Sequence, residues 1–177
     1  DEACYHEMLA HVPILAHGDV REALIIGGGD GGALREVLRH GSVDRATMVE
    51  IDRTVVDICR EHMPGLSDGA FHDPRFDLVI ADGVKFVKET AHKFDLIIVD
   101  STDPVGPAEG LFKAEFFRHC HRALADGGVL VHDVERTAAA AAGAAAPVAA
   151  AAPDPTYERP ASRRRAWART AASPHDL

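Results

Sequence analysis

Hydrophobic residues are concentrated in five short runs, separated by stretches in which apolar residues recur at helical spacing. The runs cover residues 23–26, 46–52, 76–82, 94–100 and 128–132. Each run is nearly continuous in aliphatic or β-branched residues, as in strands that are covered on both faces. The pattern therefore predicts five buried strands.

Three of the intervening segments place apolar residues on one helical face, over residues 33–39, 54–62 and 114–124. A further helix is predicted over Glu2–His11, with Pro13 as its stop. The alternation of strands and helices predicts an α/β, Rossmann-like fold in which helices cover both faces of a parallel sheet. An α+β fold is less favoured, because no strong two-residue hairpin signal joins the runs.

The composition of the chain changes near residue 134. Residues 1–134 carry 13 Lys and Arg against 24 Asp and Glu, a net charge of −11, whereas residues 135–177 have a net charge of +2. Between Ala138 and Ala152, 12 of 15 residues are alanine. Such a stretch cannot bury enough apolar surface to offset its ordering entropy. We predict one folded core at 1–134 and a low-complexity, disordered tail at 135–177.

Overall charge and cysteine content exclude several classes of protein. The net charge of −9 over 177 residues argues against nucleic acid as a partner, since phosphates require basic surface. No apolar stretch predicts a membrane span. Cys4, Cys59 and Cys120 are widely spaced and odd in number, which favours a reduced, cytoplasmic protein. The eleven histidines lack a spacing such as H-E-x-x-H, so no metal is predicted.

Acidic residues follow the predicted strands at the edge where a parallel sheet binds its ligands. Asp30, Glu50, Asp82 and Asp100 lie at or just beyond four strand ends. Any one of them fits a helix N-cap. Four carboxylates on one rim disfavour one another unless a cation is bound, so a ligand site is favoured over four separate caps.

The turn after the first strand is rich in glycine, and Gly27, Gly29 and Gly32 fit the pattern G-x-G-x-x-G. Glu50 stands 20 residues beyond Asp30, where an acid typically holds the hydroxyl groups of a ribose. The turn therefore indicates a nucleoside. Because Asp30 would repel a pyrophosphate, a cationic nucleoside is favoured over a dinucleotide.

The segment D-S-T-D-P-V-G-P, from Asp100 to Pro107, places two carboxylates three residues apart at a strand exit. A capped turn explains Asp103 before Pro104, but it does not require Asp100. Paired acids at this place suit the recognition of an ammonium group and the removal of its proton.

These motifs resemble those of the polyamine aminopropyltransferase family, and within it the spermidine synthases. The resemblance runs from Asp1 to about Val131. It rests on D-E-A-C-Y-H-E-M at 1–8, G-G-G-D-G-G at 27–32, V-E-I-D at 49–52, D-G at 82–83 and D-S-T-D-P-V-G-P at 100–107. The fold implied is a Rossmann-like sheet of the methyltransferase type.

The resemblance implies transfer of an aminopropyl group from decarboxylated S-adenosylmethionine to putrescine or a related polyamine, giving spermidine and methylthioadenosine. The donor is a co-substrate, and no prosthetic group is implied. Family members are usually dimers or tetramers, so a homodimer or homotetramer is expected. The residue roles implied are Asp100 as general base, Asp103, His6 and Tyr5 at the polyamine, Asp30 at the amine of the donor, Glu50 at the ribose, Asp82 and Gly83 at the adenine, Pro107 in the nucleoside pocket, and Gly27 and Gly29 in the loop beside it.

Two parts of the family pattern have no counterpart in this sequence. Family members carry an N-terminal β-rich domain that covers the site, and they continue beyond the fifth strand with further strands and helices. An inactive remnant that binds a nucleoside or a polyamine is therefore the alternative hypothesis. A methyltransferase that uses S-adenosylmethionine is a third. It is less favoured, because such enzymes usually carry an acid two residues before the first glycine, where this chain has Ile25.

Overall fold

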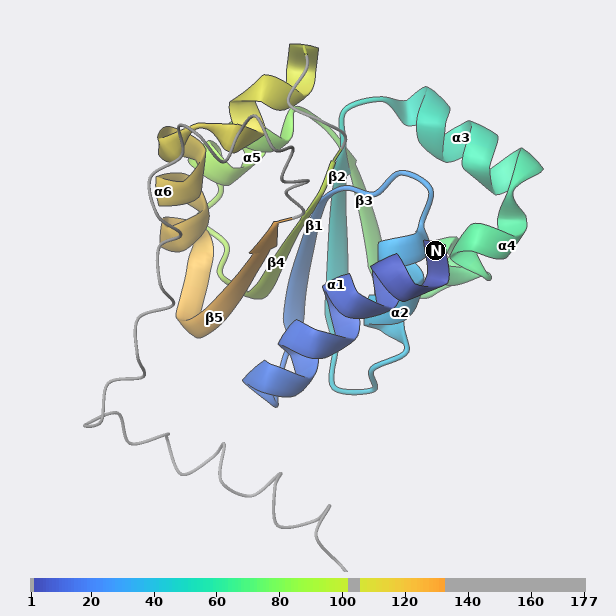
Figure 1. The fold of residues 1–177 in the computed structure, drawn as a ribbon, viewed down its shortest axis with the longest axis horizontal. Coiled ribbons are helices and arrows are strands. Elements are labelled where there is room, and N and C mark those ends of the chain that lie inside the picture. Colours follow the sequence, from blue (N-terminus) through green and yellow to red (C-terminus); the bar gives the residue numbers. More distant parts are fainter. Residues whose placement is uncertain (1, 102–105, 133–177) are drawn as a thin grey trace, which may run out of the picture. The chain divides into compact units, whose positions relative to one another are not determined.

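A five-stranded parallel sheet lies at the centre of the fold (Figure 1). The structure is a computed structural model that describes residues 2–101 and 106–132. The strands are β1 (Glu22–Gly27), β2 (Arg45–Glu50), β3 (Phe76–Ile80), β4 (Phe94–Asp100) and β5 (Leu124–His132), in the order β3-β2-β1-β4-β5. The five predicted strands and the α/β, Rossmann-like fold are confirmed. The order reverses between β1 and β4, which places the ligand crevice of such a sheet above the carboxyl ends of these strands.

Both faces of the sheet are covered by apolar clusters. Along β1, Ala23 and Ile25 belong to one cluster and Leu24 and Ile26 to the other, because successive side chains of a strand point to opposite faces. The first cluster includes residues of α1 (Glu2–His17), α2 (Gly32–Leu38), α3 (Arg53–His62) and η1 (Ala70–His72). The second includes residues of α5 (Gly83–Glu89), η2 (Gly106–Phe112) and α6 (Ala114–Ala123). A short α4 (Pro64–Ser67) follows α3. Burial on both faces explains why the strand runs in the sequence do not alternate.

The prediction that Pro13 stops the first helix is wrong. Helix α1 continues to His17, and Pro13 is buried inside it. A proline within a helix removes one backbone donor, which would favour a break. However, the buried face of α1 continues on both sides of the proline, with Leu9 before it and Ile14 after it. Packing of this face on the core therefore overrides the local signal.

Arg75 ties the segment before β3 to the end of α2. Its guanidinium donates hydrogen bonds to the carbonyl oxygens of Leu38 (2.6 Å), His40 (3.2 Å) and Val43 (3.2 Å). It also donates two to the carboxylate of Asp73, at 2.9 and 2.7 Å. These bonds hold the pKa of Asp73 below its ordinary value of 3.8. One side chain thus satisfies three carbonyls at the exit of α2.

Arg75→Met is expected to lower the free energy of unfolding by about 2–3 kcal/mol, because the carbonyls and the carboxylate lose their donors. Since folding lowers the pKa of Asp73 from 3.8, the pair stabilises the wild type above that pH and its contribution is lost as the pH falls further. In urea denaturation the variant should show a weaker acid dependence, which comes from the backbone N–H of residue 75 that still donates to Asp73 Oδ1. Arg53→Met, which removes an exposed pair with Asp57 at 3.9 Å, is the control and should cost less than about 0.5 kcal/mol. Equal losses of stability in Arg75→Met and Arg53→Met would contradict the stabilising role given to the Arg75 hydrogen bonds.

The remaining predictions on the chain as a whole concern its C-terminal part, membrane spans and cysteines. The boundary near residue 134 and the tail at 135–177 lie outside the described residues. Within the described part, no helix is long and apolar enough to span a membrane. All three cysteines are free, and burial raises the pKa of the Cys120 thiol to about 12.

Candidate active site

A cavity of about 500 Å³ opens at the carboxyl ends of β1, β2 and β4. All four acids predicted at the strand ends line it, together with the glycine loop. The full lining is Ile26, Gly27, Gly28, Gly29, Asp30, Val49, Glu50, Ile51, Val55, Asp82, Gly83, Val84, Asp100, Ser101, Ala108 and Leu111. The structure therefore brings the sequence-predicted acids to one rim around a largely apolar pocket.

The glycine loop lies directly against the strand ends on both sides. Gly27 has a φ of +83°, and a Cβ atom there would lie 2.0 Å from the carbonyl oxygen of Asp100. That same oxygen accepts a hydrogen bond from the Gly28 N–H at 2.9 Å. A Cβ atom on Gly29 would approach Oε2 of Glu50 to 2.9 Å. Glycine at these positions thus keeps the loop within contact of both Asp100 and Glu50.

Helix capping accounts for part of the acidic pattern. Oδ1 of Asp82 accepts hydrogen bonds from Val84 N (2.8 Å) and Lys85 N (3.3 Å), so it is the N-cap of α5 while it also lines the cavity. Glu50 is 8% exposed, and its Oε1 accepts a hydrogen bond from Asp52 N at 3.0 Å. That bond fixes the Glu50 carboxylate beside the cavity.

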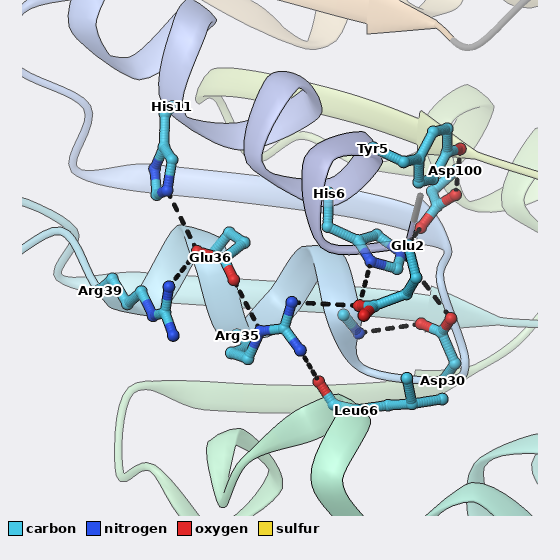
Figure 2. A network of polar contacts seen from close by, with 11 residues as sticks. Glu2, Tyr5, His6, His11, Asp30, Arg35, Glu36, Arg39, Leu66 and Asp100 are labelled. Carbon is cyan, nitrogen blue, oxygen red and sulfur yellow. Dashed lines mark hydrogen bonds and ion pairs between the residues drawn. The ribbon is translucent and has the colours of Figure 1, made fainter. Parts of the chain in front are cut away.

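Tyr5 and His6 of α1 reach the rim from the side and meet Asp30 and Asp100 (Figure 2). The Tyr5 hydroxyl donates to Oδ1 of Asp100 at 2.7 Å. Nε2 of His6 lies 3.7 Å from Oδ2 of Asp30 and 3.8 Å from Oδ2 of Asp100. Nδ1 of His6 lies 2.8 Å from Oε1 of Glu2. The side chain of His6 is 4% exposed, so its ring is fixed from behind and faces two carboxylates in front.

The two sides of the His6 ring differ in hydrogen-bonding character. An ionised carboxylate only accepts, so Nδ1 carries the proton that is shared with Glu2, and in the neutral ring Nε2 is an acceptor. Nε2 of His6 and the two carboxylate groups offer three acceptor atoms within 4.8 Å of one another. An ammonium group with three hydrogen bonds of about 2.9 Å needs acceptors about 4.7 Å apart. The cluster therefore offers three acceptor groups to an ammonium group, with His6 Nε2 at 3.7 and 3.8 Å from the two carboxylate oxygens rather than at 4.7 Å.

The same three residues could also hold a metal ion, an arrangement that spacing along the sequence did not reveal. A tetrahedral zinc ion with ligands at about 2.0–2.1 Å needs them about 3.4 Å apart. The distances of 3.7 and 3.8 Å from His6 Nε2 exceed that value. The separations thus lie between those of a metal site and those of an ammonium site.

The sequence did not reveal that Glu2 and Arg35 support His6. It also did not reveal why residue 32 is a glycine. Glu2 holds the ring, and Arg35 of α2 holds Glu2 through Nη2 at 3.1 Å. A Cβ atom on Gly32 would lie 2.2 Å from Cε1 of His6, so the last glycine of the G-x-G-x-x-G pattern makes room for this ring. The i,i+4 spacing of Glu2 and His6 on a helix was the one available signal.

Two predicted site residues are not placed. Asp103 lies outside the described residues, as does the side chain of Pro107, whose backbone belongs to η2. The roles expected for them stay predictions.

The fold and the cavity together define the structural class of the protein. A parallel sheet with a reversal in strand order, a glycine-rich turn after β1 and an acid at the end of β2 is the architecture of Rossmann-like domains that bind nucleosides and nucleotides at this edge.

Comparison with known proteins identifies the family. Residues 2–141 match the spermine/spermidine synthase domain, and the chain belongs to this family. It is 63% identical over 131 residues to polyamine aminopropyltransferase 1 of Pseudomonas aeruginosa and 61% identical to the polyamine aminopropyltransferase of Pseudomonas syringae pv. tomato. Each alignment covers 74% of this chain and 46% of the relative, so the chain spans about half the length of these curated relatives.

Solved structures agree with this assignment. A spermidine synthase in complex with the transition state analogue AdoDATO matches with a TM-score of 0.72 and 48% identity, over 75% of this chain and 45% of that chain. The spermidine synthase from Thermotoga maritima matches with a TM-score of 0.67 and 45% identity, over 75% and 43%. The resemblance predicted from the sequence motifs is confirmed.

Proposed function

We propose that the protein is an aminopropyltransferase that transfers the aminopropyl group of decarboxylated S-adenosylmethionine to putrescine or a related polyamine, giving spermidine and methylthioadenosine. The observation that carries the proposal is the cluster of three acceptors from His6, Asp30 and Asp100 beside the cavity. It suits an ammonium group at the edge of a nucleoside pocket, and both substrates are cations with such groups. The names of the relatives support the same reaction class.

The cavity offers a complementary surface for the nucleoside part of the donor. Glu50 presents a carboxylate that accepts from two ribose hydroxyl groups, and its orientation is fixed by Asp52 N. Asp82 and Gly83 stand next to it for the adenine edge, and Val49, Leu111 and their neighbours supply apolar walls. Expelling water from such walls stabilises a bound adenine.

The chemical step needs a base and good alignment. A nitrogen–carbon bond forms as the carbon–sulfur bond breaks, and the sulfonium leaves as a neutral thioether that requires no general acid. The attacking amine must first lose a proton, which costs roughly 4–5 kcal/mol for an amine of reference pKa 10.4 at pH 7. Asp100 is the acceptor for this proton, because it lies in the cavity wall and Tyr5 fixes its other oxygen. Holding nitrogen, carbon and sulfur in line contributes the larger share of the rate.

Charge at the rim separates the proposed donor from the ordinary methyl donor. Decarboxylated S-adenosylmethionine presents a bare ammonium group to Asp30 and Asp100, whereas S-adenosylmethionine adds a carboxylate that these acids repel. The methyltransferase hypothesis requires the opposite preference. In titration calorimetry we expect the decarboxylated donor to bind at least about tenfold more tightly, since like charges in contact cost well over 1.4 kcal/mol. Equal affinities would contradict the proposal.

Glu50→Gln tests the nucleoside pocket separately. The amide loses the charge that strengthens the hydrogen bonds to the ribose, so we expect the affinity for methylthioadenosine to fall about tenfold or more in calorimetry. Glu61→Gln changes an exposed carboxylate of α3 and serves as the control, with no change expected. A Glu50→Gln variant that binds as tightly as the wild type would remove Glu50 from the ribose site.

A second candidate function is binding of the two ligands without turnover. The cavity and the cluster of His6, Asp30 and Asp100 would support such binding by themselves. The cytoplasmic location and the homodimeric or homotetrameric assembly also stay predictions. The free state of Cys4, Cys59 and Cys120 supports the location, and light scattering on the purified chain would measure the assembly.

A further inference from the structure

A network of charged side chains runs from the interior of the fold to His6 (Figure 2). Oε1 of Glu2 is shared between Nδ1 of His6 at 2.8 Å and Nη2 of Arg35 at 3.1 Å. Nε of Arg35 in turn donates to Oε1 of Glu36 at 2.6 Å, and Nη1 donates to the carbonyl oxygen of Leu66 at 2.7 Å. The guanidinium thus bridges α1, α2 and α4.

Glu36, at the inner end of this network, is held by several partners. Glu36 is 1% exposed and also binds Arg39 Nη1 at 2.9 Å and His11 Nε2 at 3.1 Å. A buried carboxylate held by three donors on two helices has little freedom to move. Arg35 is 11% exposed and is therefore fixed by partners that belong to the core. Glu2, at 41% exposed, is the exposed end of this network, and Arg35 holds it there at 3.1 Å.

We propose that Glu2 and Arg35 are positioning residues of the amine site: together they keep the His6 proton on Nδ1 and leave Nε2 as an acceptor facing Asp30 and Asp100. The inference deepens the proposed function and rests on it, because the acceptor is needed only if an ammonium group binds there.

The groups around His6 show why the position of its proton must be fixed. Glu2 on the same helix faces Nδ1, while Asp30 after β1 and Asp100 at the end of β4 face Nε2. The Tyr5 ring stands edge-on to the imidazole at 5.0 Å. Glu2 lies 2.8 Å from Nδ1, whereas the two aspartate oxygens lie 3.7 and 3.8 Å from Nε2; without Glu2, the proton is favoured on the Nε2 side, which faces the two carboxylates. A donor would then stand where the ammonium donors must be received.

Arg35 balances the charge of this acceptor. The hydrogen bond from His6 and the charge of Arg35 lower the pKa of Glu2, so Glu2 stays an ionised acceptor near neutral pH. Nη2 of Arg35 also holds the Glu2 carboxylate at 3.1 Å, on the side of the ring that is opposite to Asp30 and Asp100. Arg35 therefore keeps Glu2 in the place from which it orients the ring.

Nitrogen-15 NMR of the histidine rings tests the assignment directly, with His6→Gln used to identify the signals. In the 177-residue chain we expect the tautomer with the proton on Nδ1 of His6. Glu2→Ala should move the proton to Nε2, Arg35→Met should shift the tautomers in the same direction because Glu2 loses its partner, and Arg35→Lys should restore the Nδ1 tautomer. Glu7→Ala, at an exposed position of the same helix, is the matched control and should change nothing.

Putrescine binding, measured by calorimetry, gives the second readout. We expect Glu2→Ala to weaken putrescine about tenfold, as the loss of one hydrogen bond to a charged group would, and to leave methylthioadenosine unchanged. An unchanged His6 tautomer in Glu2→Ala, or a wild type with the proton on Nε2, would overturn the inference. If the wild type binds no putrescine, the proposed function fails, while the NMR result still decides whether Glu2 and Arg35 set the ring. Glu2 is half-exposed in the first turn of α1, so its variant remains informative if Arg35→Met does not fold.

Discussion

Asp100→Asn is expected to lower the rate of aminopropyl transfer by about 10²- to 10⁴-fold, the range that a general base contributes. The amide has nearly the same shape, and its oxygen can still accept the Tyr5 hydroxyl that now lies 2.7 Å from Oδ1. It cannot take a proton from the attacking amine. In the proposed site methylthioadenosine would be held by Glu50, Asp82 and the apolar walls rather than by Asp100, so its affinity should change by less than about threefold. Single-turnover kinetics and calorimetry measure the two quantities.

Asp126→Asn is the control for this substitution. Asp126 is an exposed carboxylate on β5, and its replacement should change neither rate nor affinity. Equal losses of turnover and nucleoside affinity in Asp100→Asn would count against the base role. They would instead indicate that the carboxylate supports the pocket as a whole.

Gly27→Ala is expected to lower the free energy of unfolding by about 3 kcal/mol or more in urea denaturation. Its Cβ atom would lie 2.0 Å from the carbonyl oxygen of Asp100, and its φ of +83° disfavours any side chain. Strain at such a φ contributes about 1 kcal/mol, and the contact adds about 1–3 kcal/mol because β4 must move away. The displaced strand end carries Asp100, so activity should fall with stability.

Substitutions of two other glycines separate the cost of backbone strain from the cost of the close contact with β4. Gly69 has a φ of +82°, but a Cβ atom there would meet no other atom within 4 Å, so Gly69→Ala reports the backbone strain alone. Gly41 has open space and no positive φ, so Gly41→Ala should be neutral or slightly stabilising. If Gly27→Ala and Gly69→Ala cost the same, the close contact between the loop and β4 has no energetic weight.

The strands and the rim were predictable because their causes are local or topological. Residues 23–26 are apolar without alternation, since clusters on both faces of the sheet bury them. Once the strands are parallel, their carboxyl ends share one edge, and the acids that follow them must meet there. Asp30, Glu50, Asp82 and Asp100 accordingly line one cavity.

The parts that the sequence did not reveal depend on contacts between distant segments. The continuation of α1 past Pro13 is decided by packing on the core rather than by the proline. Helix α5 spans seven residues, as α2 does, but Val87 is its one buried residue, so it lacks the apolar face that makes α2 recognisable in the sequence. The partnership of Arg35 with Glu2 joins two helices across 33 positions of the chain. No spacing rule points to such a pair.

Product analysis tests the central claim most directly. The 177-residue chain is incubated with decarboxylated S-adenosylmethionine and putrescine, and the products are quantified by mass spectrometry. The account predicts equal amounts of spermidine and methylthioadenosine, and no methylated amine when S-adenosylmethionine replaces the decarboxylated donor. Binding of both ligands without product would contradict the proposed activity and favour the inactive remnant, and a methylated product would contradict the assignment of the cation site.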